Sequence, residues 1–177
     1  MKKMYAVMAL AALALTGCSG GAQTNSAPPE TAKATATPSP TPTIMTKAEA
    51  GKFYLATICP SNILSDKAGK AVQAEPFNLK AAKSATAALR DGYRKAIETL
   101  SNEKVLWPDP VKADVAALAE SMYGDLSGAE NAANQTTDAG FFAAWNDWTT
   151  APAQPNAQKI RLKLGLSSDT DASCKIK

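Results

Sequence analysis

Residues 76–102 read PFNLKAAKSATAALRDGYRKAIETLSN and form the most regular pattern in the chain. Small or apolar side chains recur there at alternating steps of three and four residues, at Leu79, Ala82, Thr86, Leu89, Tyr93, Ala96 and Leu100. The opposite face carries most of the lysine, arginine and acidic residues of the stretch. This spacing predicts an amphipathic helix whose apolar side packs against other helices.

Four more segments have a helical period. We expect helices from about residue 46 to 59, from 110 to 133, from about 138 to 148 and from 156 to 164. No stretch of the chain shows sustained alternation of β-branched and polar residues, so we expect no sheet. The sequence therefore predicts an all-α domain, a small bundle of four or five helices, over residues 45–177.

The ends of these helices have recognisable signals. Thr46 followed by Glu49 is a capping-box pattern, and the stripe Ala48, Gly51, Leu55 and Ile58 then runs to Cys59-Pro60, where we expect the first helix to end. Asp109 is expected to cap the third helix, Thr137 or Asp138 the fourth, and Gly165 to close the fifth in a left-handed conformation. We expect residues 61–75 to be a mixed connection, with room for one turn of helix around Ser65 to Ala71, and residues 167–177 to be an irregular tail.

The chain begins with a short basic and apolar leader. Met1-Lys2-Lys3 precedes an apolar stretch over residues 4–15, which is the layout of a secretory signal peptide. The next residues, Leu15-Thr16-Gly17-Cys18, resemble the lipobox of bacterial lipoproteins. That resemblance implies removal of residues 1–17, a diacylglyceryl group on the sulfur of Cys18, and a cell-membrane anchor that faces the extracytoplasmic side.

A spacer rich in proline and threonine follows the expected lipidation site. Residues 18–44 hold almost no large apolar side chain, so we expect a disordered tether. The tether resembles those of actinobacterial lipoproteins. The chain also resembles small helical lipoproteins of that group, most of which have no known activity. The resemblance lies in the helical pattern, the sequence Cys-Pro-Ser-Asn at residues 59–62 and the sequence Lys-Leu-Gly-Leu at residues 163–166.

Two further cysteines remain, Cys59 and Cys174. Export would place them in an oxidising compartment, where an even number of cysteines favours a disulfide. We therefore expect a bond between the first helix and the tail, with two separate buried thiols as the alternative.

The charge of the mature chain is nearly balanced. Loss of Lys2 and Lys3 with the leader reduces the 19 basic side chains to 17, against 16 acidic ones. A net charge of +1 is too small for the basic surface that nucleic-acid binding needs, so we expect no nucleic acid as a partner. It also argues against a polybasic membrane footprint, which leaves acyl chains as the means of attachment.

The sequence lacks the residue types of several common active sites. It has no histidine, which excludes a Ser-His-Asp triad and imidazole ligands to a metal, and we expect no cofactor or metal site. Carboxylates are what remains for acid–base chemistry, as the pairs Asp109 with Asp114 or Asp125 with Glu130. The same spacing is also expected if these side chains only cap a helix or lie on solvent-exposed helix faces, without a catalytic role.

Aromatic residues are concentrated in the expected fourth helix and just after it. Phe141, Phe142, Trp145 and Trp148 either fill a core otherwise rich in alanine, or present Phe142 or Trp148 in a groove for a partner.

The function that these features favour is a non-enzymatic binding or interaction module of the cell envelope. Its partner would be an envelope protein, a peptide or a wall component. Two alternatives are a carboxylate-based hydrolase that acts on cell-wall polymers and a helical domain that binds a small ligand.

Overall fold

The structure is a computed structural model, and it describes residues 43–148 and 153–175. The expected signal peptide 1–17, the expected lipidation site Cys18 and the tether up to residue 42 lie outside the described residues. Within the described part, no helix is both long enough and apolar enough to span a membrane.

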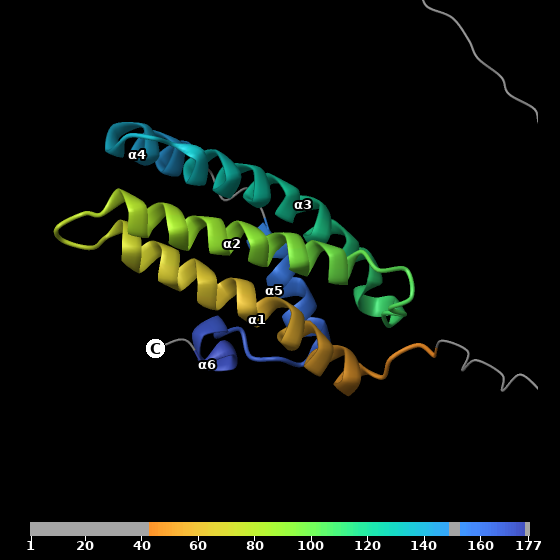
Figure 1. The fold of residues 1–177 in the computed structure, drawn as a ribbon. Helices are drawn as coiled ribbons and strands as arrows, with labels where there is room; N and C mark the ends of the chain where they lie inside the picture. The colour runs from red at the N-terminus through yellow and green to blue at the C-terminus, as the bar shows by residue number, and fades with distance from the viewer. Residues whose placement is uncertain (1–42, 149–152, 176–177) are drawn as a thin grey trace, which may run out of the picture. The chain divides into compact units, whose positions relative to one another are not determined.

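The described residues form six helices and no strand, which confirms the all-α prediction (Figure 1). The helices are α1 Lys47–Val72, α2 Leu79–Leu100, α3 Asp109–Asn134, α4 Asp138–Asp147, α5 Ala153–Leu164 and α6 Thr170–Cys174.

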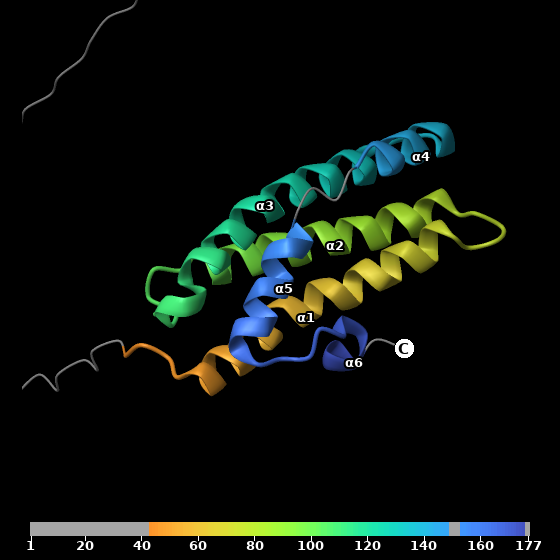
Figure 2. The same cartoon turned by 180° about the vertical axis from the view of Figure 1, so that it is seen from behind.

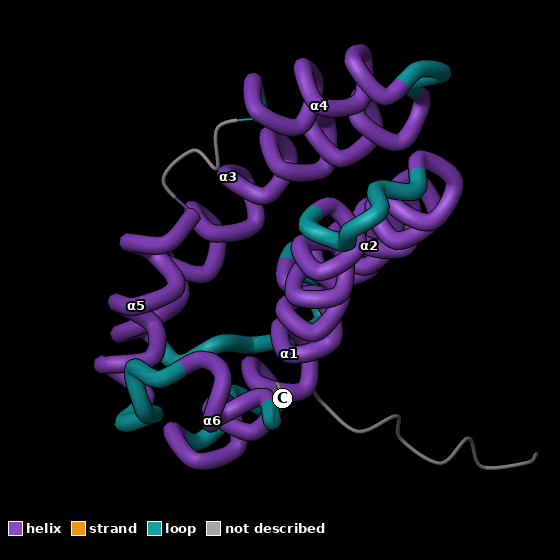
Figure 3. Tube along the Cα trace, turned by 90° about the vertical axis from the view of Figure 1, so that its left-hand side faces the viewer, coloured by secondary structure: helices purple, strands orange, loops and turns teal. Residues whose placement is uncertain are grey.

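Three long helices make the body of the domain. α2 lies between α1 and α3 and runs antiparallel to both, and α4 folds back along the end of α3 (Figure 1). Seen from behind, α5 crosses α1 and also contacts α3, while α6 packs on α1 (Figure 2). Figure 3 shows the end view, with α3 and α5 on one side and α1 and α2 on the other. Four helices thus surround one interior.

The interior holds one main cluster of apolar side chains. Buried residues from α1, α2, α3 and α5 meet there, including Ile58, Ile97, Leu118 and Ile160. A second, smaller cluster lies under α4 around the fully buried Phe141. The stripe of α2 behaves as predicted at Ala82, Thr86, Leu89, Ala96 and Leu100, all of which are buried.

The expected end of the first helix at Pro60 is wrong, because α1 continues to Val72. A proline inside a helix removes a backbone hydrogen bond and costs about 3 kcal/mol. Pro60 and Ala56, whose carbonyl loses its partner, both lie on the exposed side of α1, where water can hydrate the carbonyl. The second half of α1 packs closely on α2, since a Cβ at Gly92 would lie 2.8 Å from Leu64 Cδ1. This packing offsets the cost.

The buried face of α1 also differs from the expected stripe. Ala48 is exposed and Leu55 is half-buried, whereas Ala50 and Tyr54 are fully buried. The helix is therefore rotated towards Tyr54, and this rotation decides which polar group of α1 reaches the interior.

The helix caps mostly follow the sequence. The Thr46 capping box is present, and the hydroxyl of Thr137 accepts a hydrogen bond from Gly140 N at 3.1 Å. Gly165 has φ +73° and closes α5, with Leu166 N donating to Arg161 O at 2.8 Å. Asp109 is not the cap of α3, because Pro108 takes that position without a side-chain hydrogen bond.

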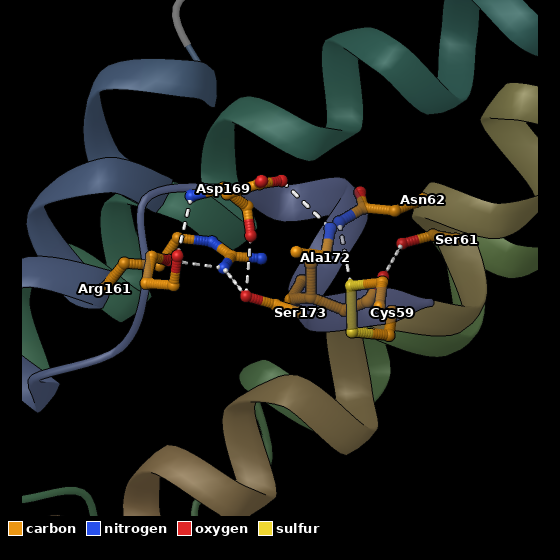
Figure 4. Close-up of a disulfide and its surroundings, with 10 residues drawn as sticks. Cys59, Ser61, Asn62, Arg161, Asp169, Ala172 and Ser173 are labelled. Atoms are coloured by element: carbon orange, nitrogen blue, oxygen red, sulfur yellow. Dashed lines mark hydrogen bonds between the residues drawn. A yellow bond between two sulfur atoms is a disulfide. The ribbon is translucent and has the colours of Figure 1, made fainter. Parts of the chain in front are cut away.

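The predicted disulfide is confirmed. Cys59 in α1 is bonded to Cys174 at the end of α6, with their Cα atoms 5.0 Å apart (Figure 4). The expectation of an irregular tail is wrong in part, because the tail contains the short helix α6. Asp169 caps this helix, and its Oδ1 accepts from Ala172 N at 2.9 Å. The disulfide and this cap hold the tail against the middle of α1.

Candidate functional site

A pocket of about 390 Å³ lies between the helices, with walls from α1, α2, α3, α5 and α6. Its apolar wall comes from Ile58, Leu118, Met122 and Ala157, and its polar groups include Tyr54, Tyr93, Asp125 and Arg161. We call this the central pocket. Its volume falls in the lower part of the range of small-molecule sites.

A larger hollow of about 610 Å³ lies at the connection of α2 and α3, beside Trp107 and Tyr123. It brings together fewer buried polar side chains than the central pocket does. In the lining of this larger hollow, Trp107 Nε1 is buried and has no hydrogen-bond partner among the described residues. The charged residues of the lining are exposed. The central pocket is therefore the stronger candidate site.

Two side chains of the central pocket are buried with an unused hydrogen-bonding atom. Arg161 is 2% exposed and Tyr54 is 0% exposed. Arg161 Nη2 and Tyr54 Oη have no hydrogen-bond partner in the described structure. Such buried polar atoms are uncommon in folded proteins, because each forgoes its hydration without a replacement.

The guanidinium of Arg161 is held on one side only. Its Nη1 donates to Ser173 Oγ in α6 at 3.2 Å (Figure 4) and to Ser167 O, before α6, at 2.9 Å. These acceptors are neutral, and none of the ion pairs in residues 43–148 and 153–175 includes Arg161. Among the described residues, the positive charge is thus buried with no carboxylate within ion-pair distance.

Tyr54 lies next to this charge. The centre of its ring is 6.0 Å from Arg161 Cζ. Burial raises the pKa of Tyr54 to about 12, and the positive charge and the donor groups of the neighbouring Arg161 oppose the rise. Tyr54 keeps its proton at neutral pH, as tyrosine ordinarily does, and can donate a hydrogen bond.

Asp125 supplies a carboxyl to the same pocket from α3. It is 6% exposed, and its Oδ1 accepts from Trp148 Nε1 at 3.3 Å. Burial raises the pKa of Asp125, and the hydrogen bond from Trp148 opposes the rise. Burial likewise raises the pKa of Tyr93, which the negative charge of Asp125 raises further.

The two predicted partner-binding aromatics pack within the domain. Phe142 is half-buried against Phe77, with ring centres 4.4 Å apart. Trp148, also half-buried, contacts the edges of Tyr93 and Trp145. These contacts account for both side chains within the fold, and partner binding by either one stays a prediction.

The carboxylates considered for acid–base chemistry have other contacts. Asp114 pairs with Lys163 at 2.6 Å, and Glu130 lies 3.6–3.8 Å from Arg94 and Arg90. Asp109 is exposed in the first turn of α3. Within the described ranges, no three or more Asp, Glu or Cys side chains form a group that could hold a metal ion.

Sequence reasoning missed Tyr54 and Arg161 as site residues. A signal was present for Arg161, since Ala157, Arg161 and Leu164 follow steps of four and three and place a charge within an apolar stripe. Tyr54 lies one helical step before Ile58, but the expected stripe used Leu55 instead. Neither pattern indicates that the two side chains meet.

The central pocket thus has a buried positive charge, two donors without acceptors, a carboxyl group and an apolar wall. This combination suits reversible binding of a small polar molecule. No protein-family model, curated protein or solved structure matches the chain.

Proposed function

We propose that this protein is a membrane-anchored extracytoplasmic lipoprotein whose helical domain binds a small ligand in the central pocket and catalyses no reaction. The observation that carries the ligand-binding part is the pair of buried atoms Arg161 Nη2 and Tyr54 Oη, which line one pocket without a partner. A ligand that supplies acceptors would satisfy both atoms.

The anchoring part comes from the beginning of the chain. A basic start, an apolar stretch and the sequence Leu15-Thr16-Gly17-Cys18 together support export and lipidation of Cys18. A diacylglyceryl group carries two acyl chains, which give the stable attachment that one chain alone does not.

The contacts of the acidic side chains favour binding over hydrolysis of wall polymers. Glycoside hydrolysis normally needs two carboxyl groups that face one bond. Of the four acidic residues considered, Asp125 lines the central pocket, while Asp114 and Glu130 contact basic side chains elsewhere. The packing of Phe142 and Trp148 within the fold likewise makes the pocket a better supported site than an aromatic helical face.

The anchor is tested by the substitution Cys18→Ala. We expect the variant to leave the membrane fraction or to keep its leader, as seen by fractionation and intact-protein mass spectrometry. Normal processing with unchanged membrane attachment would overturn the lipoprotein assignment.

Ligand binding is tested by equilibrium dialysis of the purified protein against a small-molecule cell extract, followed by mass spectrometry. We expect a compound to be enriched by the wild-type protein and not by Ala157→Phe, which places a ring in the central pocket. Ala113→Phe is the matched control, because Ala113 is exposed on α3 and outside the pocket lining. Equal enrichment by all three proteins, or none, would contradict the proposal.

A further inference from the structure

Both unused polar atoms of the central pocket can donate a hydrogen bond. Arg161 Nη2 is a donor only, and the Tyr54 hydroxyl, which like any tyrosine hydroxyl keeps its proton at neutral pH, can donate as well as accept. The two side chains are close, with Arg161 Cζ 6.0 Å from the centre of the Tyr54 ring. A group that only accepts hydrogen bonds would therefore complement both.

The charge of the site points in the same direction. A guanidinium buried to 2% exposure with only neutral acceptors has an uncompensated positive charge. Burial of such a charge is costly unless it is paired. An anionic acceptor would supply both the missing charge and the missing hydrogen bonds, and a carboxylate fits the edge of a guanidinium well.

The rest of the pocket limits the body of the ligand. The side chains of Ile58, Leu118 and Met122 form an apolar wall, so a fully polar ion would leave that wall without a contact. One water occupies about 30 Å³ in the liquid, so 390 Å³ corresponds to roughly a dozen waters. The space is ample for a molecule of amino-acid size together with several waters.

Resting on the proposed binding function, we propose that the central pocket takes a small carboxylate with an apolar body, whose carboxylate accepts hydrogen bonds from Arg161 Nη2 and Tyr54 Oη. Two sources share this chemistry, a short branched carboxylic acid and an apolar amino acid. They differ in what they offer to Asp125, another residue of the lining, whose Oδ1 accepts from Trp148 and whose carboxyl group can also meet an ammonium group.

Four matched probes separate these possibilities: 4-methylpentanoate, leucine, and the amide of each. Binding is measured by titration calorimetry and by thermal shift on the mature protein purified from membranes. We expect each acid to bind at least about tenfold more tightly than its amide, because the amide removes the charge that Arg161 would pair. Equal affinities of acid and amide would overturn the proposal.

Tyr54→Phe tests the site without disturbing α6. The hydroxyl of Tyr54 has no hydrogen-bond partner among the residues that the structure describes, so its removal should leave the melting temperature unchanged or higher. We expect about fivefold weaker binding of the acids and a smaller loss for the amides, whose neutral carbonyl is the weaker acceptor. Arg161 is a poorer choice, because its Nη1 also holds Ser167 and Ser173. Unchanged acid affinity in Tyr54→Phe would contradict the assignment.

Asp125→Asn distinguishes the two sources. If leucine binds more tightly than 4-methylpentanoate and loses this advantage in Asp125→Asn, the ligand is of the amino-acid type; if not, it is of the carboxylic-acid type. Both outcomes support a carboxylate. Enrichment of a compound without a carboxylate group in the dialysis experiment would overturn the ligand class while the binding function stands.

Discussion

The indole Nε1 of Trp148 donates to Oδ1 of Asp125 at 3.3 Å, across the interface between the end of α4 and the middle of α3. Asp125 is 6% exposed and forms part of the central pocket. Trp148 therefore links the aromatic cluster of α4 to the candidate site. This link makes its hydrogen bond a good place to test the structure.

Replacing Trp148 by phenylalanine should remove this hydrogen bond and keep most of the ring contact with Tyr93. We expect the free energy of unfolding to fall by about 1–2 kcal/mol, since a buried acceptor loses its donor. Urea denaturation of Trp148→Phe, Asp125→Ala and the double variant measures the coupling, because alanine has no side-chain oxygen to accept from the indole. Fully additive effects of the two substitutions would show that the side chains do not interact.

The pH dependence of stability should report Asp125. Burial raises its pKa in the folded state, so folding favours the protonated form. Its contribution is present below the unfolded pKa and is lost as the pH rises through the folded value. We expect Asp125→Asn to be more stable relative to wild type at pH 7 than at pH 4, as measured by urea denaturation across that range. A difference independent of pH would contradict the raised pKa.

Two glycines of α3 offer a matched pair. A Cβ at Gly128 would lie 2.4 Å from Trp148 Cδ1, whereas a Cβ at Gly124 would meet nothing within 4 Å. We expect Gly124→Ala to raise the free energy of unfolding by about 0.5–1 kcal/mol, because alanine is the better helix former. Gly128→Ala should lower it by about 1–3 kcal/mol and shift the tryptophan fluorescence, because the indole has to move. Similar gains in both variants would place Trp148 elsewhere.

The disulfide should contribute strongly to stability. It closes a separation of 115 residues, for which the chain-entropy model gives at most about 5 kcal/mol. We expect Cys59→Ser, Cys174→Ser and the double variant to lose similar amounts in urea denaturation. Treatment of the wild type with a reductant should lower its stability to the level of the variants. No change on reduction would contradict a bond in the folded protein.

Much of the fold could be predicted from local sequence. The stripe from Leu79 to Leu100 has a strict helical period, and caps such as Thr46 and Thr137 act within three or four residues, so neither depends on the rest of the chain. The pairing of Cys59 with Cys174 followed from the number of cysteines left after the one assigned to lipid. Pro60 was misleading because its cost to the helix is offset by packing on α2, which is a contact distant in sequence.

By itself, the sequence determined the helical class, the positions of most helices and the disulfide, because helix periodicity, capping and cysteine pairing depend on few residues. Only the tertiary structure decided the candidate site. Tyr54, Asp125 and Arg161 come from α1, α3 and α5, and their meeting depends on how α1 is rotated and on how α5 crosses it. Burial then leaves a charge and two donors without acceptors, a property that belongs to the packed interior rather than to any segment of the chain.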